Sequence, residues 1–143
     1  MKVLNSMKTV FESRSVNEAY ARCAAAAFLT CADPALDEVC DIKTAVSEAV
    51  TNCIVHGYRD TVGKIYITVK LMEDGRAVIQ VKDKGCGIEN IAQARQPLFT
   101  TAAEEERAGL GFAVMESCMD KVRVYSRLGK GTTVVLEKKL TLK

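Results

Sequence analysis

Histidine and paired cysteines are scarce in this sequence. It contains one histidine, His56, and its six cysteines include no Cys-x-x-Cys pair. Zinc sites need cysteine and histidine ligands at short, regular spacings, so the sequence excludes a zinc site. A disulfide framework is also not expected, because the cysteines are irregularly spaced in a chain of cytosolic character. Cys86 stands apart because it lies between two glycines, where we expect an exposed thiol.

Long apolar runs and a strong excess of charge are also missing. No run approaches the roughly 20 residues that span a bilayer, and the N-terminal residues lack the apolar core of a signal peptide. The 20 Lys and Arg residues against 18 Asp and Glu residues give a net charge of +2, too small for a nucleic-acid or membrane-surface binder. We therefore expect a cytoplasmic protein with no direct contact to nucleic acid or membrane, and a single domain over residues 1–143.

Apolar periodicity predicts an α+β chain. The expected strands are 3–12, 64–72, 76–83, 121–127 and 132–140, and the expected helices are 15–32, 35–56 and 112–119. Ser15 and Glu18 form a capping-box pattern for the first helix, and Asp33 before Pro34 is typical of an N-cap for the second. Helices that cover one face of a mixed sheet make a two-layer sandwich.

The first helix has an ambiguous outer face. Its regular apolar stripe predicts the core face: Val16, Ala19, Tyr20, Cys23, Ala24, Ala27, Phe28 and Cys31. The opposite face carries Ala21, Ala25, Ala26 and Leu29 with Arg22 as its single charge. Two explanations stay open, because alanine is the best helix former and because a flat, charge-poor face with an arginine anchor suits protein docking.

The second helix combines a core face with a polar line. Its apolar residues recur at helical spacing: Ile42, Ala45, Val46, Ala49, Val50, Cys53 and Ile54. Thr44, Glu48, Asn52 and His56 follow one another at four-residue steps, each a rotation of only about 40°. We expect Glu48 and Asn52 to be half-buried and to need partners. Asp83 poses the same problem, because it continues the inward phase of strand 76–83.

Three motifs occur in a distinctive order: Glu48-x-x-x-Asn52, Asp83-x-Gly85-x-Gly87 and Gly109-x-Gly111. Together they resemble the N, G1 and G2 boxes of the ATPase superfamily that includes gyrase, Hsp90, histidine kinases and MutL. The segments 47–58, 94–101 and 106–112 further resemble the bacterial anti-sigma factor serine kinases of the sporulation type. This resemblance implies a Bergerat-type ATP-binding fold.

The resemblance also implies an activity and partners. It indicates an ATP-dependent protein serine kinase that binds and inhibits a sporulation sigma factor. The kinase phosphorylates a serine of its antagonist, the anti-anti-sigma factor, and works as a homodimer. ATP or ADP and Mg²⁺ are the implied cofactors.

Residue roles carry over position by position. Asn52 would coordinate Mg²⁺ and Glu48 would be the general base, with Arg107 offsetting charge near the phosphates. Asp83 would accept a hydrogen bond from the adenine amine, and Arg22 would contact the protein partners. The other residues implied to contact the nucleotide are Gly85, Gly87, Thr100, Thr101, Gly109, Leu110, Gly111 and Thr132.

Three alternatives remain at this point. The chain could regulate a general-stress sigma factor instead, or it could be an ATP-dependent sequestering module without kinase activity. Glu48 favours the kinase, because a pure binder needs no base. The catalytic part of a sensor histidine kinase is disfavoured, because that class needs an upstream helical hairpin with a phosphoacceptor histidine and the only histidine here is His56.

Overall fold

The computed structural model describes residues 2–88, 91 and 111–141. The strands are β1 (Val3–Glu12), β2 (Lys64–Met72), β3 (Arg76–Asp83), β4 (Lys121–Arg127) and β5 (Gly131–Lys139). The helices are α1 (Glu18–Leu29), α2 (Leu36–Asn52) and α4 (Gly111–Cys118), with short helical turns η1 (Ser15–Asn17), η2 (Thr30–Ala32) and η3 (Cys53–Gly57). The predicted strands and helices are all present.

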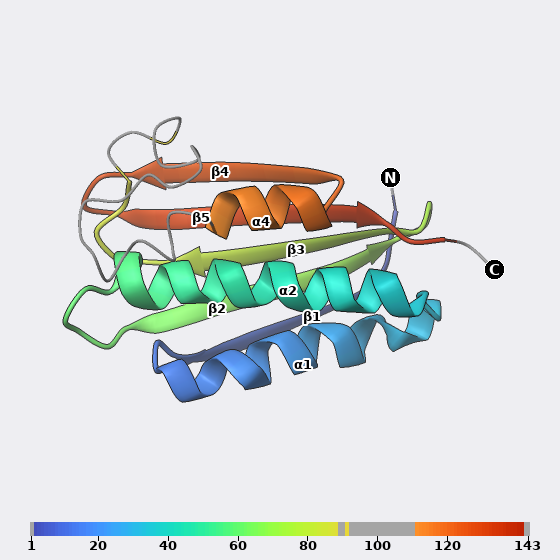
Figure 1. Ribbon diagram of the computed structural model, residues 1–143, viewed down its shortest axis with the longest axis horizontal. Coiled ribbons are helices and arrows are strands. Elements are labelled where there is room, and N and C mark those ends of the chain that lie inside the picture. The colour runs from blue at the N-terminus through green and yellow to red at the C-terminus, as the bar shows by residue number, and fades with distance from the viewer. Residues whose placement is uncertain (1, 89–90, 92–110, 142–143) are drawn as a thin grey trace.

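The strands form one sheet in the order β1-β2-β3-β5-β4, and α1, α2 and α4 lie across one of its faces (Figure 1). This arrangement confirms the predicted α+β two-layer sandwich. The prediction of a mixed sheet is wrong, because all four pairings among the described strands are antiparallel. Antiparallel hairpins join β2 to β3 and β4 to β5, and β5 then lies antiparallel to β3.

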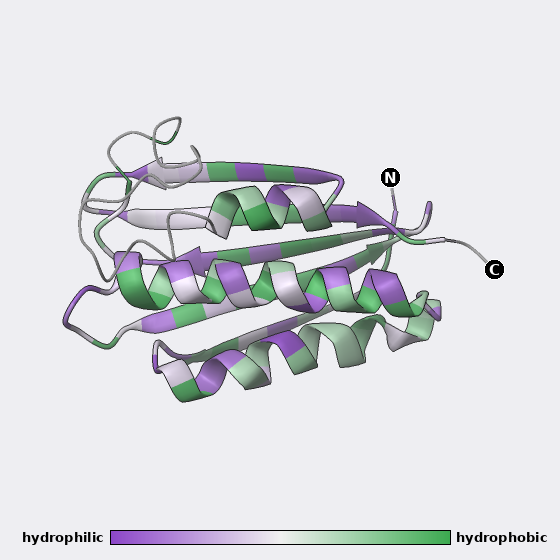
Figure 2. Cartoon of the chain, in the orientation of Figure 1, coloured by the Kyte–Doolittle hydropathy of each residue, from purple (hydrophilic) through white to green (hydrophobic). Residues whose placement is uncertain are grey.

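The core lies between the sheet and α2. The strands alternate between hydrophobic and hydrophilic residues, and so does α2 along its length (Figure 2). On β2, the inward residues Ile65, Ile67, Val69 and Leu71 are buried, as predicted. The predicted core face of α2 is also confirmed for Ile42, Ala45, Val46, Ala49, Val50 and Cys53. This burial removes most of the apolar surface of α2 from water and fixes the helix on the sheet.

The predicted faces of α1 are reversed in the structure. Ala21, Ala25 and Leu29, which we placed on the outer face, are at most 1% exposed, whereas Val16 and Tyr20 of the predicted core stripe are 77% and 50% exposed. Small side chains at four-residue steps let α1 lie against α2. The alanine-rich face is therefore not a docking face.

The predicted helix caps are also wrong. The chain enters α1 through the 3-10 turn η1, and no side-chain cap bond forms at Arg14 or Asn17. Asp33 has a left-handed backbone (φ 47°), and α2 begins only at Leu36. There, the Glu38 carboxylate accepts hydrogen bonds from Ala35 N (2.8 Å) and from Thr141 N (2.9 Å). Glu38 therefore caps the start of α2 locally and also connects it to Thr141, a contact across 103 positions that local sequence does not indicate.

The second helix changes geometry at its end. Residues Cys53–Gly57 form a π-helical turn, in which the Tyr58 amide donates to Cys53 O (2.9 Å). π-turns widen a helix and are frequent at functional sites. None of the helices in the described ranges is long and apolar enough to cross a bilayer.

Candidate functional site

The site begins where the π-turn η3 meets the end of β3. A Cβ on Gly57 would lie 2.8 Å from Asp83 Cγ, and a Cβ on Gly85 would lie 1.9 Å from Gly57 O. Only glycine fits at both positions, so the two backbones touch. The Cys86 amide closes the contact by donating to Gly57 O (2.9 Å). The predicted strand exit Asp83-x-Gly85 is therefore held directly against the end of the second predicted helix.

Asp83 is a buried carboxylate, only 3% exposed. Burial raises the pKa of Asp83, although hydrogen bonds from Gly85 N, the Cys53 thiol and Thr132 N oppose the rise. The Gly85 amide donates to Oδ1 at 2.9 Å. Cys53 shares these surroundings. Its burial and the neighbouring Asp83 carboxylate raise the pKa of its thiol well above the usual value. Cys53 consequently stays protonated and donates to Asp83.

Thr132 lies beside Asp83, as the resemblance implied. The two residues are partners in the β3–β5 register. The Thr132 hydroxyl contacts Ser126 Oγ at 2.8 Å, and Ser126 Oγ accepts from the Ile88 amide at 2.7 Å. This chain of hydrogen bonds ties the loop after Gly87 to β4 and β5.

The polar line of α2 meets the start of α4. A Cβ on Gly111 would lie 3.2 Å from Asn52 Oδ1 and 3.3 Å from Glu48 Oε2. Glu48 and Asn52 are both half-buried, as predicted. The last glycine of the Gly109-x-Gly111 motif thus lies beside both residues of the Glu48-x-x-x-Asn52 motif. Sequence positions about 60 apart come together here.

Asn52 carries the clearest sign of an incomplete site. Its Oδ1 atom is buried and has no hydrogen-bond partner among the described residues. Buried polar atoms in proteins are almost always paired, and an unpaired one needs an explanation. An amide oxygen is a ligand suited to Mg²⁺, which needs few protein groups because it keeps waters and phosphate oxygens. The residues present therefore fit the implied cation.

Several predicted residues lie outside the described ranges. These are Thr100, Thr101, Arg107, Gly109 and Leu110. Their roles remain predictions. Arg22 is described: its guanidinium pairs with Glu18 at 2.9 Å, on the same helix.

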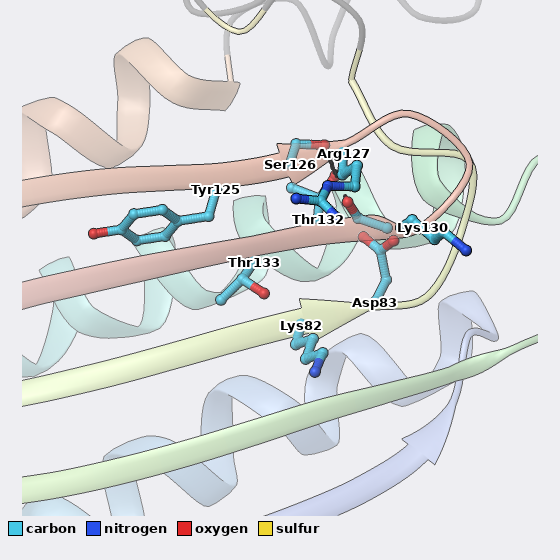
Figure 3. A pocket seen from close by; sticks show the side chains of 9 residues that line it. Lys82, Asp83, Tyr125, Ser126, Arg127, Lys130, Thr132 and Thr133 are labelled. Carbon is cyan, nitrogen blue, oxygen red and sulfur yellow. Dashed lines mark hydrogen bonds between the residues drawn. The ribbon is translucent and has the colours of Figure 1, made fainter.

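A shallow pocket of about 300 Å³ opens next to Asp83. Asp83, Ser126, Arg127, Lys130 and Thr132 gather at the turn between β4 and β5 (Figure 3). Lys82, Tyr125 and Thr133 also line it, from the outward phase of their strands. These residues were not predicted as part of a site, because the alternation along the strands indicates only that they face solvent.

Two side-chain contacts were not predicted from the sequence. Cys53 lies in the core, as predicted, and its thiol also donates a hydrogen bond to Asp83, 30 positions away. Cys86 is exposed, as expected, and its thiol donates to His56 O at 2.9 Å. The pair of glycines around Cys86 was the available signal for the second contact, but the sequence held none for the first.

Fold and site together define a nucleotide-binding ATPase domain. The family described as histidine kinase-like ATPase domain matches residues 11–138, and the chain belongs to this family. It is similar to the anti-sigma F factor of Geobacillus sp. (strain WCH70), with 53% identity over 96% of this chain and 94% of the relative. The anti-sigma F factor of Priestia megaterium is 49% identical over the same shares.

Solved structures confirm the fold. The crystal structure of the RsbU and RsbW domains of a Mycobacterium tuberculosis protein matches with a TM-score of 0.69 at 20% identity, over 95% of this chain and 32% of that one. The histidine kinase domain of a blue-light activated kinase from Erythrobacter litoralis matches with a TM-score of 0.56 at 18% identity, over 86% of this chain and 60% of that one. At this identity the likeness concerns the fold alone.

Proposed function

We propose that the chain is an anti-sigma factor with ATP-dependent protein serine kinase activity. It binds and inhibits a sporulation sigma factor, and it phosphorylates a serine of the anti-anti-sigma factor that opposes it. The anti-sigma F factors that share about half of its residues support this proposal, since they align with nearly the whole chain. A sigma-factor partner would place the protein in the cytoplasm.

One observation carries the kinase proposal: Asn52 Oδ1, which has no hydrogen-bond partner within the described ranges, lies next to Gly111, with Glu48 one helical turn earlier. Asn52 would hold Mg²⁺, which would neutralise charge on the phosphates when nucleotide is bound. Gly111 leaves space beside both side chains. A carboxylate so close to a cation-binding amide is what phosphoryl transfer to a hydroxyl requires, because one group orients the phosphates and the other receives the proton.

Glu48 would act as the general base. The attacking serine hydroxyl of the partner protein gives its proton to the Glu48 carboxylate as its oxygen bonds to the γ-phosphorus of ATP. The bond from that phosphorus to the bridging oxygen breaks, and ADP leaves. Arg107 would offset the charge that develops on the transferred group.

Asp83 would recognise the adenine base of the nucleotide. Its carboxylate is a buried acceptor next to Gly85 and Thr132, and it would accept a hydrogen bond from the exocyclic amine of adenine. Gly87 would also contact the nucleotide, and the residues proposed for the phosphates are Thr100, Thr101, Gly109, Leu110 and Gly111. The N–H groups at a helix start suit phosphate oxygens.

Arg22 would contact the protein partners. It lies on α1 with its side chain partly exposed, and its pairing with Glu18 within the same helix leaves it at the surface. The protein would work as a homodimer. Large apolar side chains exposed along β1, among them Leu4 and Val10, support self-association.

Phosphate transfer tests the proposal directly. The protein is incubated with Mg²⁺, γ-labelled ATP and the anti-anti-sigma protein of the same host. We expect label on one serine of that protein. If the chain binds both nucleotide and sigma factor but transfers no phosphate, it is a sequestering module, and if it binds only a general-stress sigma factor, the assigned partner is wrong.

A further inference from the structure

Tyr58 is a buried tyrosine that the proposed chemistry does not use. It follows the π-turn η3 directly and is 8% exposed. Gly63 packs flat on its ring: a Cβ there would lie 2.2 Å from Tyr58 Cε1. Gly63 is itself held by Ser13, whose Oγ accepts from Gly63 N at 2.9 Å. The ring is therefore fixed between the end of α2 and the start of β2.

The Tyr58 hydroxyl bridges two strand ends. It donates to Lys64 O at 2.6 Å and accepts from Lys84 N at 2.7 Å. The β2–β3 register ends with the pair Ile65 and Asp83, so Lys64 and Lys84 would form the next pair. The hydroxyl stands between them in place of a direct ladder contact. Burial raises the pKa of Tyr58, so the hydroxyl keeps the proton that it donates.

This bridge fixes the backbone that carries the Asp83 carboxylate. Lys84 is the residue between Asp83 and Gly85, and Gly85 N donates to Asp83 Oδ1. On its other side the carboxylate touches Gly57. Rotation of the peptide at Lys84 would therefore break the Gly85 contact and turn the carboxylate. Oriented hydrogen bonds of this kind, made by a residue that does not touch the ligand, commonly fix the geometry of binding sites.

We propose that Tyr58 is a positioning residue for base recognition: by holding the Lys84 peptide, it aims the Asp83 carboxylate at the exocyclic amine of the purine. The inference rests on the proposed function, in which Asp83 accepts from that amine. Tyr58 then contributes to selectivity for an aminopurine, rather than to nucleotide affinity in general. If the tyrosine only stabilised the fold, its loss would change the affinity for all nucleotides equally.

The test compares two nucleotides on Tyr58→Phe. Binding of Mg²⁺-ADP and of Mg²⁺-purine riboside 5′-diphosphate, which lacks the amine, is measured by calorimetry on the full chain. We expect Tyr58→Phe to weaken ADP about tenfold, the effect of one hydrogen bond, and to leave the amine-free nucleotide unchanged. In an Asp83→Asn background the same substitution should have no further effect on ADP. Tyr20→Phe is the matched control, since it also removes a hydrogen-bonded hydroxyl, to Thr9 at 2.7 Å.

The outcomes separate the two proposals. If the wild-type protein binds both nucleotides equally, the role of Asp83 in the proposed function is wrong. If the wild type prefers ADP and Tyr58→Phe weakens both nucleotides equally, or neither, the positioning role is overturned. Amide exchange in the wild-type protein gives a second measurement that needs no variant. The Lys84 amide should be protected and should exchange more slowly with ADP than with the amine-free nucleotide, and an unprotected amide would overturn the inference.

Discussion

The two ends of α2 differ in how their buried polar groups are hydrogen-bonded. Near its start, the Glu38 carboxylate is 8% exposed and accepts hydrogen bonds from Ala35 N, Thr141 N and Thr141 Oγ1. At its end, Asn52 Oδ1 is buried with no partner among the described residues. The same helix thus holds one buried polar group with several hydrogen-bond partners and one that has none in the part of the chain that the structure describes.

This difference suggests that Glu38 contributes to the stability of the fold, whereas Asn52 serves the proposed ligand site. Burying a polar atom without a hydrogen bond costs about 1–3 kcal/mol, so a fold that retains one gains nothing in stability from it. Glu38 ties the end of the chain to the start of α2. Under the proposed function, bound Mg²⁺ would supply the partner for Asn52 Oδ1. Changes at the two ends should therefore affect different properties.

The largest effect is expected from Glu48→Gln. The substitution removes the proposed base but keeps the shape of the side chain, so phosphate transfer should fall about 100- to 10,000-fold. Mg²⁺-ADP affinity should change less than twofold, which calorimetry measures alongside the transfer assay. Transfer at the wild-type rate would show that Glu48 is not the base.

Glu38→Ala should have the opposite profile. It leaves the amides of Ala35 and Thr141 without their charged acceptor and should lower the free energy of unfolding by about 1.5–3 kcal/mol. Nucleotide affinity should stay unchanged in the folded protein. Urea titration measures the first quantity and calorimetry the second. An unchanged unfolding free energy would remove the contrast between the two ends of the helix.

Arg22→Glu changes neither polar group and tests a third property. Reversing a charge at a protein contact should weaken binding of the sigma factor about tenfold or more. Nucleotide affinity should match the wild type, and the free energy of unfolding should fall by no more than about 1 kcal/mol, because the exposed ion pair with Glu18 becomes a like-charge pair. Surface plasmon resonance gives the partner affinity, and thermal unfolding is the control. Loss of both partner and nucleotide binding would indicate a folding defect instead.

The pH dependences of ADP affinity and of the unfolding free energy should distinguish the two buried carboxylates, Asp83 and Glu38. Burial raises the pKa of Asp83 above the ordinary 3.8 of an aspartate, so this acceptor is lost first as the pH falls. For Glu38, burial alone would raise the pKa, but its hydrogen bonds outweigh burial and hold the pKa below 4.5. A depressed pKa contributes stability above the unfolded value and loses it only as the pH falls through the folded value. ADP affinity should therefore fall at a higher pH than the unfolding free energy does, and the reverse order would contradict the assignment.

Strongly alternating segments were predictable from the sequence. The inward residues of β2, the inward Asp83 and the core face of α2 follow from side-chain periodicity alone. The half-buried state of Glu48 and Asn52 follows from their place at the edge of that face. α1 was misread because both of its faces are apolar and rich in alanine, so periodicity gives no contrast and packing against α2 decides.

Contacts between distant segments were not predictable from local pattern. The bond from Thr141 to Glu38 connects the start of α2 to a residue 103 positions away. The Tyr58 hydroxyl bridges the first residue of β2 and the residue that follows β3. The π-turn Cys53–Gly57 has no local sequence signature of its own. In each case tertiary geometry decides between conformations that the sequence alone permits.

The unfolding free energy of Asn52→Ala, measured in urea with and without Mg²⁺-ADP, tests the central claim most directly. Wild type should gain about 2.7 kcal/mol when the ligand is at 100 times its dissociation constant. Asn52→Ala should gain almost nothing from the ligand. Without ligand it should be at least as stable as the wild type, because the substitution removes the buried oxygen that has no partner among the described residues. A variant that loses stability without ligand, or is stabilised by Mg²⁺-ADP as strongly as the wild type, would contradict the account.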